Sequence, residues 1–270
     1  MKVLRFFAIA ALMVSSSVVL NGDARADLVT ISINNPGNSS FSLTPLWYGF
    51  HDGGFDFFDP GTTASASLEA LAEDGIVSGL QSDFTTLATL GQQGVLAAPG
   101  GFAGAPVIEP GETASFTFDL NASNRFLSFA SMIIPSNDSF IGTPNAIEIF
   151  NADGTFVGGG NSRTLTIRYE NIWDAGTEVN DTFGAAFSLV GGTSTDENGL
   201  IGLLPPGGLD NFLNTQTPAG TIERLFSPGS TVATITITAV PEPSSMALIA
   251  LVGTSFVAFR RRMKGKKISA

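Results

Sequence analysis

The chain has 270 residues, no cysteine, one histidine and a formal net charge of −11 at pH 7, so disulfides, thiol catalysis, cysteine-based metal sites and the usual zinc sites are excluded. Nine of the 13 basic residues lie in the first 25 or the last 11 positions, and residues 27–240 therefore contain 22 acids, 4 bases and a charge of −18. A surface this acidic repels nucleic acid and anionic lipid, so neither is an expected partner.

The N-terminus has the pattern of a secretory signal peptide. Lys2 and Arg5 precede an apolar run over residues 6–20, and Ala24-Arg25-Ala26 offers a small-x-small cleavage site. We predict a signal peptide over residues 1–26, with the mature chain beginning near Asp27. The alternative is an uncleaved membrane anchor. The apolar run is short for that role, since a membrane span needs about 20 apolar residues.

Residues 27–240 are long enough for one domain with its own core. Val29, Ile31 and Ile33 alternate with polar residues, which is typical of a half-buried strand. Similar runs are found at 114–120, 125–134, 146–150, 164–169, 185–190 and 231–240. Clusters of Gly, Asn, Asp and Pro separate them and mark turns, so the pattern predicts an all-β sandwich or barrel.

Two segments depart from the strand pattern. Between Ala64 and Leu90 the apolar residues fall at helical spacing, which predicts two short helices broken near Gly75. Residues 191–230 are rich in Gly, Pro, Thr and Asn and are expected to form a long loop insertion before the last strand.

Aromatic and acidic residues alternate in one short stretch: Asp52, Phe55, Asp56, Phe57, Phe58 and Asp59. The stretch is either an exposed binding loop, a second cation site, or the edge of the core with solvated acids between the rings. The pattern favours the core edge, because a half-buried edge needs this alternation in any case. Trp47 and Tyr48 are likewise expected in the core rather than on a carbohydrate platform.

A further feature is a set of three acids in two polar turns. A strand that ends at Pro135 is followed by a polar turn carrying Asp138, and Asp174 and Glu178 flank Gly176, which lets the chain curl. Calcium takes six to eight oxygen ligands, which such loops can supply. We therefore predict that Asp138, Asp174 and Glu178 bind one calcium ion; the alternative is that they are solvated turn residues.

Four segments in order resemble the spondin N-terminal domain family: His51-Asp52-Gly53-Gly54-Phe55, Leu68 to Gly75, Ser131-Met-Ile-Ile-Pro-Ser-Asn-Asp-Ser-Phe-Ile-Gly142, and Trp173-Asp-Ala-Gly-Thr-Glu178. The resemblance implies an antiparallel β-sandwich with a calcium ion at one end, held by Asp138, Asp174 and Glu178. Glu178 departs from the family's aspartate by one methylene. Ser139 stands where the animal proteins tend to have Trp, so their binding surface is not expected here.

The C-terminus has three parts in sequence. Pro241-Glu242-Pro243 leads into an apolar segment over residues 246–259, and six basic residues follow between 260 and 267. This order predicts a C-terminal membrane helix whose basic end stays in the cytoplasm. Residues 241–267 resemble the PEP-CTERM sorting signal, which implies a transient inner-membrane anchor, recognition by an exosortase and removal of the tail. The alternative is a permanent membrane tail.

The sequence gives little support for catalysis. His51 is the only histidine, and no Gly-x-Ser-x-Gly elbow, phosphate loop or dinucleotide motif is present. We predict an exported, calcium-binding, non-catalytic adhesion or binding module of the cell surface or extracellular matrix, with exopolysaccharide or a surface ligand as partner. The alternative is a secreted hydrolase acting on polysaccharide, because two-carboxylate hydrolysis needs no histidine.

Overall fold

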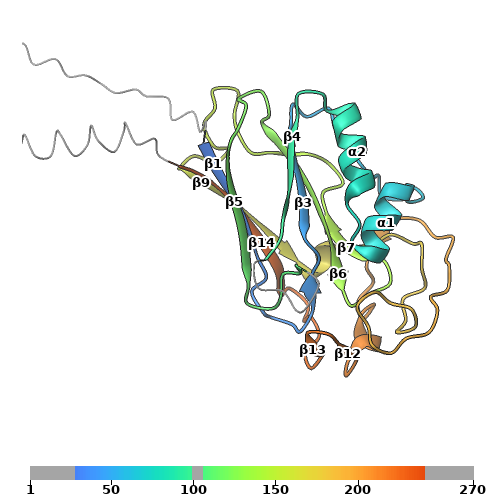
Figure 1. Cartoon of the computed structure of the whole chain (residues 1–270). Coiled ribbons are helices and arrows are strands. Elements are labelled where there is room, and N and C mark those ends of the chain that lie inside the picture. The colour runs from blue at the N-terminus through green and yellow to red at the C-terminus, as the bar shows by residue number, and fades with distance from the viewer. Residues whose placement is uncertain (1–27, 99–105, 241–270) are drawn as a thin grey trace, which may run out of the picture.

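The computed structural model describes residues 28–98 and 106–240, and the predicted signal peptide, membrane segment 246–259 and sorting tail lie outside them. Two antiparallel sheets are stacked (Figure 1). The smaller sheet has the order β5-β1-β14-β9, and the larger has the order β11-β10-β7-β6-β3-β4. The expected all-β class with antiparallel sheets is confirmed.

The smaller sheet consists of β1 (Leu28–Asn34), β5 (Thr113–Asp119), β9 (Ser162–Arg168) and β14 (Thr231–Ala239). The path of the larger sheet consists of β3 (Leu46–His51), β4 (Gln92–Leu96), β6 (Phe126–Ile134), β7 (Ser139–Gly142), β10 (Ile172–Asp174) and β11 (Gly202–Leu203). The short strands β2 (Ser42–Leu43) and β8 (Ile147–Glu148) also pair with β6. A separate hairpin joins β12 (Gln216–Thr217) to β13 (Gly220–Thr221).

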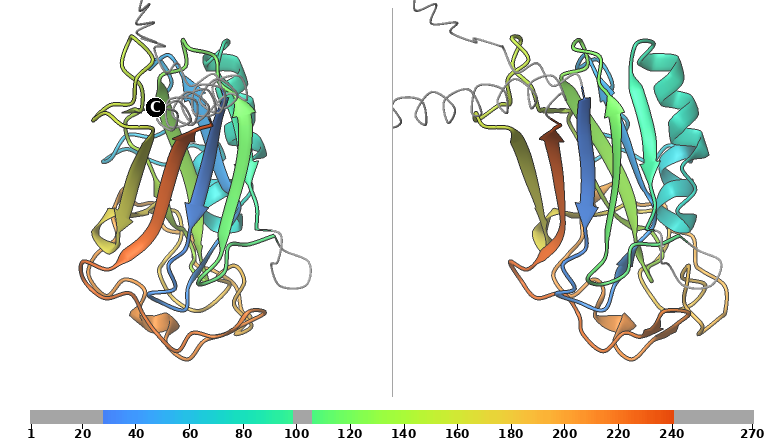
Figure 2. Two further views of the ribbon diagram at one scale, coloured as in Figure 1. Left: turned by 90° about the vertical axis from the view of Figure 1, so that its left-hand side faces the viewer. Right: turned by 60° about the vertical axis from the view of Figure 1, so that its left-hand side comes forward.

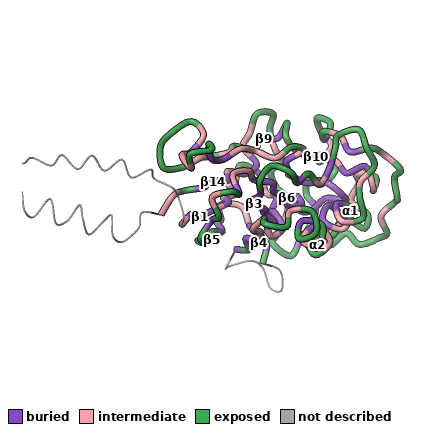
Figure 3. The backbone as a smooth tube through the Cα atoms, turned by 90° about the horizontal axis from the view of Figure 1, so that it is seen from above, coloured by how far each residue is buried: buried purple, intermediate pink, exposed green. Residues whose placement is uncertain are grey.

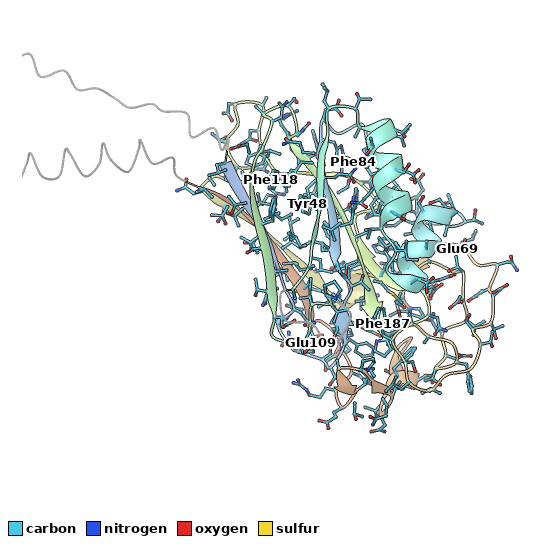
Figure 4. The ribbon with its side chains drawn as sticks, in the orientation of Figure 1. Tyr48, Glu69, Phe84, Glu109, Phe118 and Phe187 are labelled. Carbon is cyan, nitrogen blue, oxygen red and sulfur yellow. The ribbon has the colours of Figure 1, made fainter. Side chains whose placement is uncertain are left out.

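The main core lies between the two sheets. Ile31 and Ile33 of β1 belong to the same buried cluster as Tyr48 and Phe50 of β3. The Tyr48 ring centroid lies 5.8 Å from that of Phe118 on β5 (Figure 4). The alternating polar residues of the smaller sheet point the other way and are at least partly exposed. The period-two pattern of β1 therefore reports a strand buried on one face only.

Two helices cover the other face of the larger sheet (Figure 2): α1 (Ala66–Asp74) and α2 (Ser78–Leu87). Ser65 caps α1 by accepting a hydrogen bond from the Leu68 N–H. Gly75 ends α1 with φ +70°, in the left-handed region that glycine tolerates best. The predicted pair of helices and the break near Gly75 are both confirmed.

The helices and the sheet form a second buried cluster, which includes Leu68, Leu71, Phe84 and Trp47. Phe84 of α2 lies against the sheet (Figure 4), with its ring 5.6 Å from the Trp47 ring. The larger sheet is thus covered on both faces, as the concentration of buried residues along β3 and β6 shows (Figure 3).

Most of the predicted strands are present, with two corrections. The strand predicted at 185–190 is wrong: Ala186 forms a single bridge with Ser136, Phe187 has φ +63°, and the chain turns back so that the Gly184 N–H donates to the Gly191 carbonyl. The segment is apolar enough for a strand but lies at the sheet's end, where no neighbouring strand continues the ladder. The strand predicted at 146–150 shortens to β8.

The predicted loop insertion at 191–230 is present. It contains β11, the hairpin β12–β13 and a single 3-10 turn (Asp210–Phe212) between long irregular stretches. With residues 175–190 it forms the layer of loops at the lower end of the domain in Figure 1. In the parts of the chain that the structure describes, no helix is both long and apolar enough to cross a membrane.

Replacing Gly49 tests the contact between the larger sheet and the helices. A Cβ at Gly49 would lie 2.4 Å from Cε2 of Phe84, so Gly49→Ala should force the ring and α2 outward. We expect a loss of about 1–3 kcal/mol in the free energy of unfolding, measured by chemical denaturation. Gly202→Ala is the control, since its Cβ meets only the Leu200 carbonyl at 3.8 Å; an equal loss in both variants would contradict this packing.

Candidate metal centre

The turn that follows β6 is folded into the protein. Ser136, Asn137, Asp138 and Ser139 are all 0% exposed. Ser136 Oγ donates to the Ile133 carbonyl at 2.6 Å and accepts from the Ser139 N–H at 3.1 Å, which closes the turn on itself. The sequence suggested an acid presented at a strand end, and the structure instead buries it.

Asp138 has one satisfied and one unsatisfied carboxylate oxygen. Its Oδ2 accepts from the backbone N–H of Thr177 at 2.8 Å and of Glu178 at 3.1 Å. Its Oδ1 is buried without a hydrogen-bond partner. Burial, followed by repulsion from the Asp174 carboxylate, raises the pKa of Asp138 to about 7. An ionised carboxylate in this position lacks a compensating charge.

Asp174 lies beside Asp138 because β10 pairs with β7, which places Asp174 opposite Ser139. Its Oδ1 accepts from the Gly176 N–H at 2.8 Å, and its Oδ2 accepts from the Asn180 side-chain amide. Burial raises the pKa of Asp174, and these two hydrogen bonds oppose the rise. The structure therefore brings together two of the three predicted carboxylates.

Glu178, the third, joins Asp138 through its backbone N–H. Burial raises the pKa of its carboxyl group, hydrogen bonds with Ser194 and Asn137 lower it, and Asp196 and Asp74 are the charges that act on it. The Glu178 carboxylate thus lies among a different set of neighbours from Asp174. Within residues 28–98 and 106–240, no three or more His, Cys, Asp or Glu side chains are grouped so as to hold a metal ion.

Several polar groups near this pair were not predicted from the sequence. Ser139 Oγ and Asn180 Oδ1 are buried oxygens without a hydrogen-bond partner, like Asp138 Oδ1. Glu73, at the end of α1, hydrogen-bonds Thr177 and interacts with Glu178. Asn180 lies six residues after Asp174, and Glu73 lies in the segment Leu68 to Gly75 that resembles the spondin family. No spacing rule identifies either residue as part of a metal site.

Backbone geometry at Gly176 is required for this arrangement. Gly176 has φ +69°, and a Cβ there would lie 2.9 Å from the Gly199 carbonyl carbon and the Leu200 nitrogen. The Gly199 N–H donates to the Gly176 carbonyl at 2.8 Å. The close approach of residues 199–200 therefore depends on glycine, which explains how the loop curls between Asp174 and Glu178.

The other candidate acids lie apart from this turn. Asp52, Asp56 and Asp59 are exposed, whereas Phe55 and Phe58 are 2% and 6% exposed. This matches the expected core edge with solvated acids between the rings. Trp47 and Tyr48 are buried, as expected.

Titration of Asp138 should leave a signature in the stability of the metal-free protein. Its pKa is about 7 when folded, against 3.8 ordinarily, so the folded state holds the proton more tightly between these values. This proton therefore stabilises the folded protein fully below about pH 3.8, and the contribution to the free energy of unfolding is lost as the pH rises through about 7. With a chelator present, we expect the melting temperature to fall by several degrees across this window, and to fall less in Asp138→Asn. Identical slopes in both proteins would contradict the prediction.

Comparisons with known proteins identify two parts of the chain. The Spondin_N family model matches residues 34–189, more than half of the chain, and the PEP-CTERM protein-sorting motif matches residues 239–262. A search of curated proteins found no match. The sorting motif marks a protein that is exported, recognised by exosortase-type machinery and sorted to the cell surface. The matched residues include β3, β6, β7 and β10 together with Asp138 and Asp174. The chain therefore belongs to the spondin N-terminal domain family.

Proposed function

We propose that this exported protein is a calcium-stabilised, non-catalytic binding module of the cell surface or extracellular matrix, anchored transiently in the inner membrane before sorting. The proposal depends first on one observation, the unpartnered Oδ1 of the fully buried Asp138 beside the Asp174 carboxylate. The two carboxylates repel each other, and a hard cation would relieve that repulsion and coordinate the unpartnered oxygen of Asp138.

Several oxygens suit such an ion. Asp138 Oδ1 and the Asp174 carboxylate would be the charged ligands, and Asn180 Oδ1 and Ser139 Oγ are buried oxygens still without a partner. Glu178 would contribute from its present position only after its side chain turned away from Ser194 and Asn137. When bound, calcium supplies charge compensation and ties the turn after β6 to the loop after β10.

The non-catalytic part of the proposal is supported by His51. The His51 ring is 1% exposed, its Nε2 lies 3.1 Å from Ser128 Oγ, and its Nδ1 accepts from the Gly53 N–H at 3.1 Å. Burial lowers the pKa of His51. Both ring nitrogens thus serve the fold, and Ser128 is equally buried, so this His–Ser pair cannot reach a substrate.

The position of the chain ends supports presentation at a surface. The Val240 N–H donates to the Leu28 carbonyl at 2.9 Å, so the described domain begins and ends at one place. Asp138, Asp174 and the loops lie at the opposite end, because β1 and β6 each run from the end of the domain near Leu28 to that of the loops (Figure 1). If the chain were anchored through the segment after Val240, the end of the domain that carries the loops would lie farthest from the anchor.

Calcium binding is tested by thermal unfolding of residues 27–240 with calcium and then with a chelator. At about 100 times its dissociation constant, an ion that binds only the folded state contributes ~2.7 kcal/mol, a shift of several degrees. Asp174→Asn should abolish that shift, because it removes a ligand charge.

Asp83→Asn is the matched control, since Asp83 is an exposed acid on α2. It should keep the full calcium-dependent shift. A parent protein whose melting temperature ignores calcium would show that the buried carboxylates are held by the fold alone, and the calcium proposal would be abandoned.

The adhesion role is tested in cells. A deletion strain should lose surface attachment or change its matrix composition, and the parent gene should restore both. A gene with Pro241-Glu242-Pro243 replaced by alanines should not restore them, because the protein would not be sorted. Unchanged attachment and matrix after deletion would count against an adhesion module.

A further inference from the structure

An open cleft of about 270 Å³ lies beside the loop that joins β3 to α1. Asp56, Phe57 and Asp59 line it from the loop, Thr63 and Ser65 line it towards α1, and Ile201 closes the far side. The cleft is separate from the buried turn of Asp138, and nothing in the calcium proposal uses it.

The walls of the cleft are fixed by the fold. The Gly61 N–H donates to the Ile201 carbonyl and the Ile201 N–H donates to the Thr62 carbonyl, both at 2.8 Å. The Phe57 ring packs against Trp47 at 5.8 Å and against Phe58 at 4.9 Å. The loop is therefore held on both sides, and the cleft is preformed rather than made by a ligand.

The charge of the cleft selects its ligand. Asp56 and Asp59 are both exposed, and no basic residue lines the cleft. The one ion pair among the described residues, Arg125 with Glu148, does not involve them. Asp56 is exposed, but the neighbouring loop atoms remove part of its hydration, and this partial desolvation, opposed by backbone hydrogen bonds and reinforced by the Asp59 charge, raises its pKa. An anionic ligand would be repelled here, and a cationic group would be attracted.

The other lining groups favour a sugar ring. The half-buried Phe57 offers an apolar surface, and the Thr63 hydroxyl can donate and accept hydrogen bonds. The Ser65 oxygen caps α1, but its hydroxyl hydrogen can still be donated to a ligand. A volume near 270 Å³ is just below the range of about 300–1,000 Å³ that is usual for ligand sites, and it suits a single ring. We propose that this cleft binds an amino-sugar residue of a polysaccharide, with its ammonium group compensated by Asp56 and Asp59. The inference deepens the binding-module proposal by naming a ligand class.

The test is calorimetric titration of the purified exported protein with the glucosamine disaccharide at mildly acidic pH, where the sugar amines are protonated. The parent should bind one equivalent, and binding should weaken as salt is added. Asp59→Asn should weaken it at least tenfold. Phe57→Leu should also weaken it, although it leaves the charge unchanged.

Asp52→Asn is the control for general attraction between a cationic sugar and the acidic domain. Asp52 is an exposed acid in the same loop that does not line the cleft, so its replacement should leave the affinity unchanged. The proposal would be overturned if Asp52→Asn lost as much affinity as Asp59→Asn. It would also be overturned if the neutral cellobiose or the anionic digalacturonate bound as tightly as the glucosamine disaccharide. Hydrolysis of the disaccharide that is lost in Asp59→Asn would likewise overturn it, because the acidic pair would then act in catalysis rather than in binding alone.

Each titration is made with calcium and with a chelator. Binding in both conditions supports the cleft whether or not the calcium site exists, because the two sites share no residue. Absence of binding in a protein that is stabilised by calcium would reject the amino-sugar site alone.

Discussion

Burial of the larger sheet on both faces is the constraint on which the rest of the structure depends. The smaller sheet covers one face and the two helices cover the other, so β3 contributes Tyr48 and Phe50 to one cluster and Trp47 to the second. Gly49 allows the helix layer to approach, because the Phe84 ring occupies the space where a side chain would be. The same layering positions both candidate sites. Strand β6 ends at the buried acidic turn, β7 begins there and β10 ends beside it, and the loop that leads from β3 to the helices forms the cleft.

The sequence predicted the strands of the smaller sheet, whose outer face is wet, and the long apolar strand β6 of the larger sheet. Val29, Ile31 and Ile33 alternate with polar residues because β1 is covered on one side only. Strand β3 is also buried throughout, but it is shorter than β6 and contains Gly49, so neither alternation nor a long apolar run marks it. Strands β4, β7 and β10 are too short or irregular for a period to appear. Leu189 and Val190 show the opposite failure, because they are 63% and 48% exposed despite their strand-like composition.

The candidate site was predictable in position and less so in detail. The turn chemistry placed Asp138 after a strand end and Asp174 with Glu178 in a curl around Gly176, and the pairing of β7 with β10 brings Asp138 and Asp174 together. No sequence rule indicates that the Ser136–Ser139 turn is buried, because its residues are the polar ones that usually face water. The direction of the Glu178 side chain depends on Ser194 and Asp196, which belong to a loop whose path the sequence does not specify.

The two acidic features differ in the free energy that a cation could supply. Asp138 is fully buried and bonded to Thr177, 39 residues away in the chain, so the ligands assemble only when the domain folds. An ion bound there stabilises the native state by mass action and would act only on folded protein. Asp56 and Asp59 are exposed on one short loop, so they are solvated before and after folding, and a ligand there gains attraction without stabilising the core. A buried site suits a structural ion and an exposed cleft suits an exchangeable ligand, which is why one domain can hold both without competition between them.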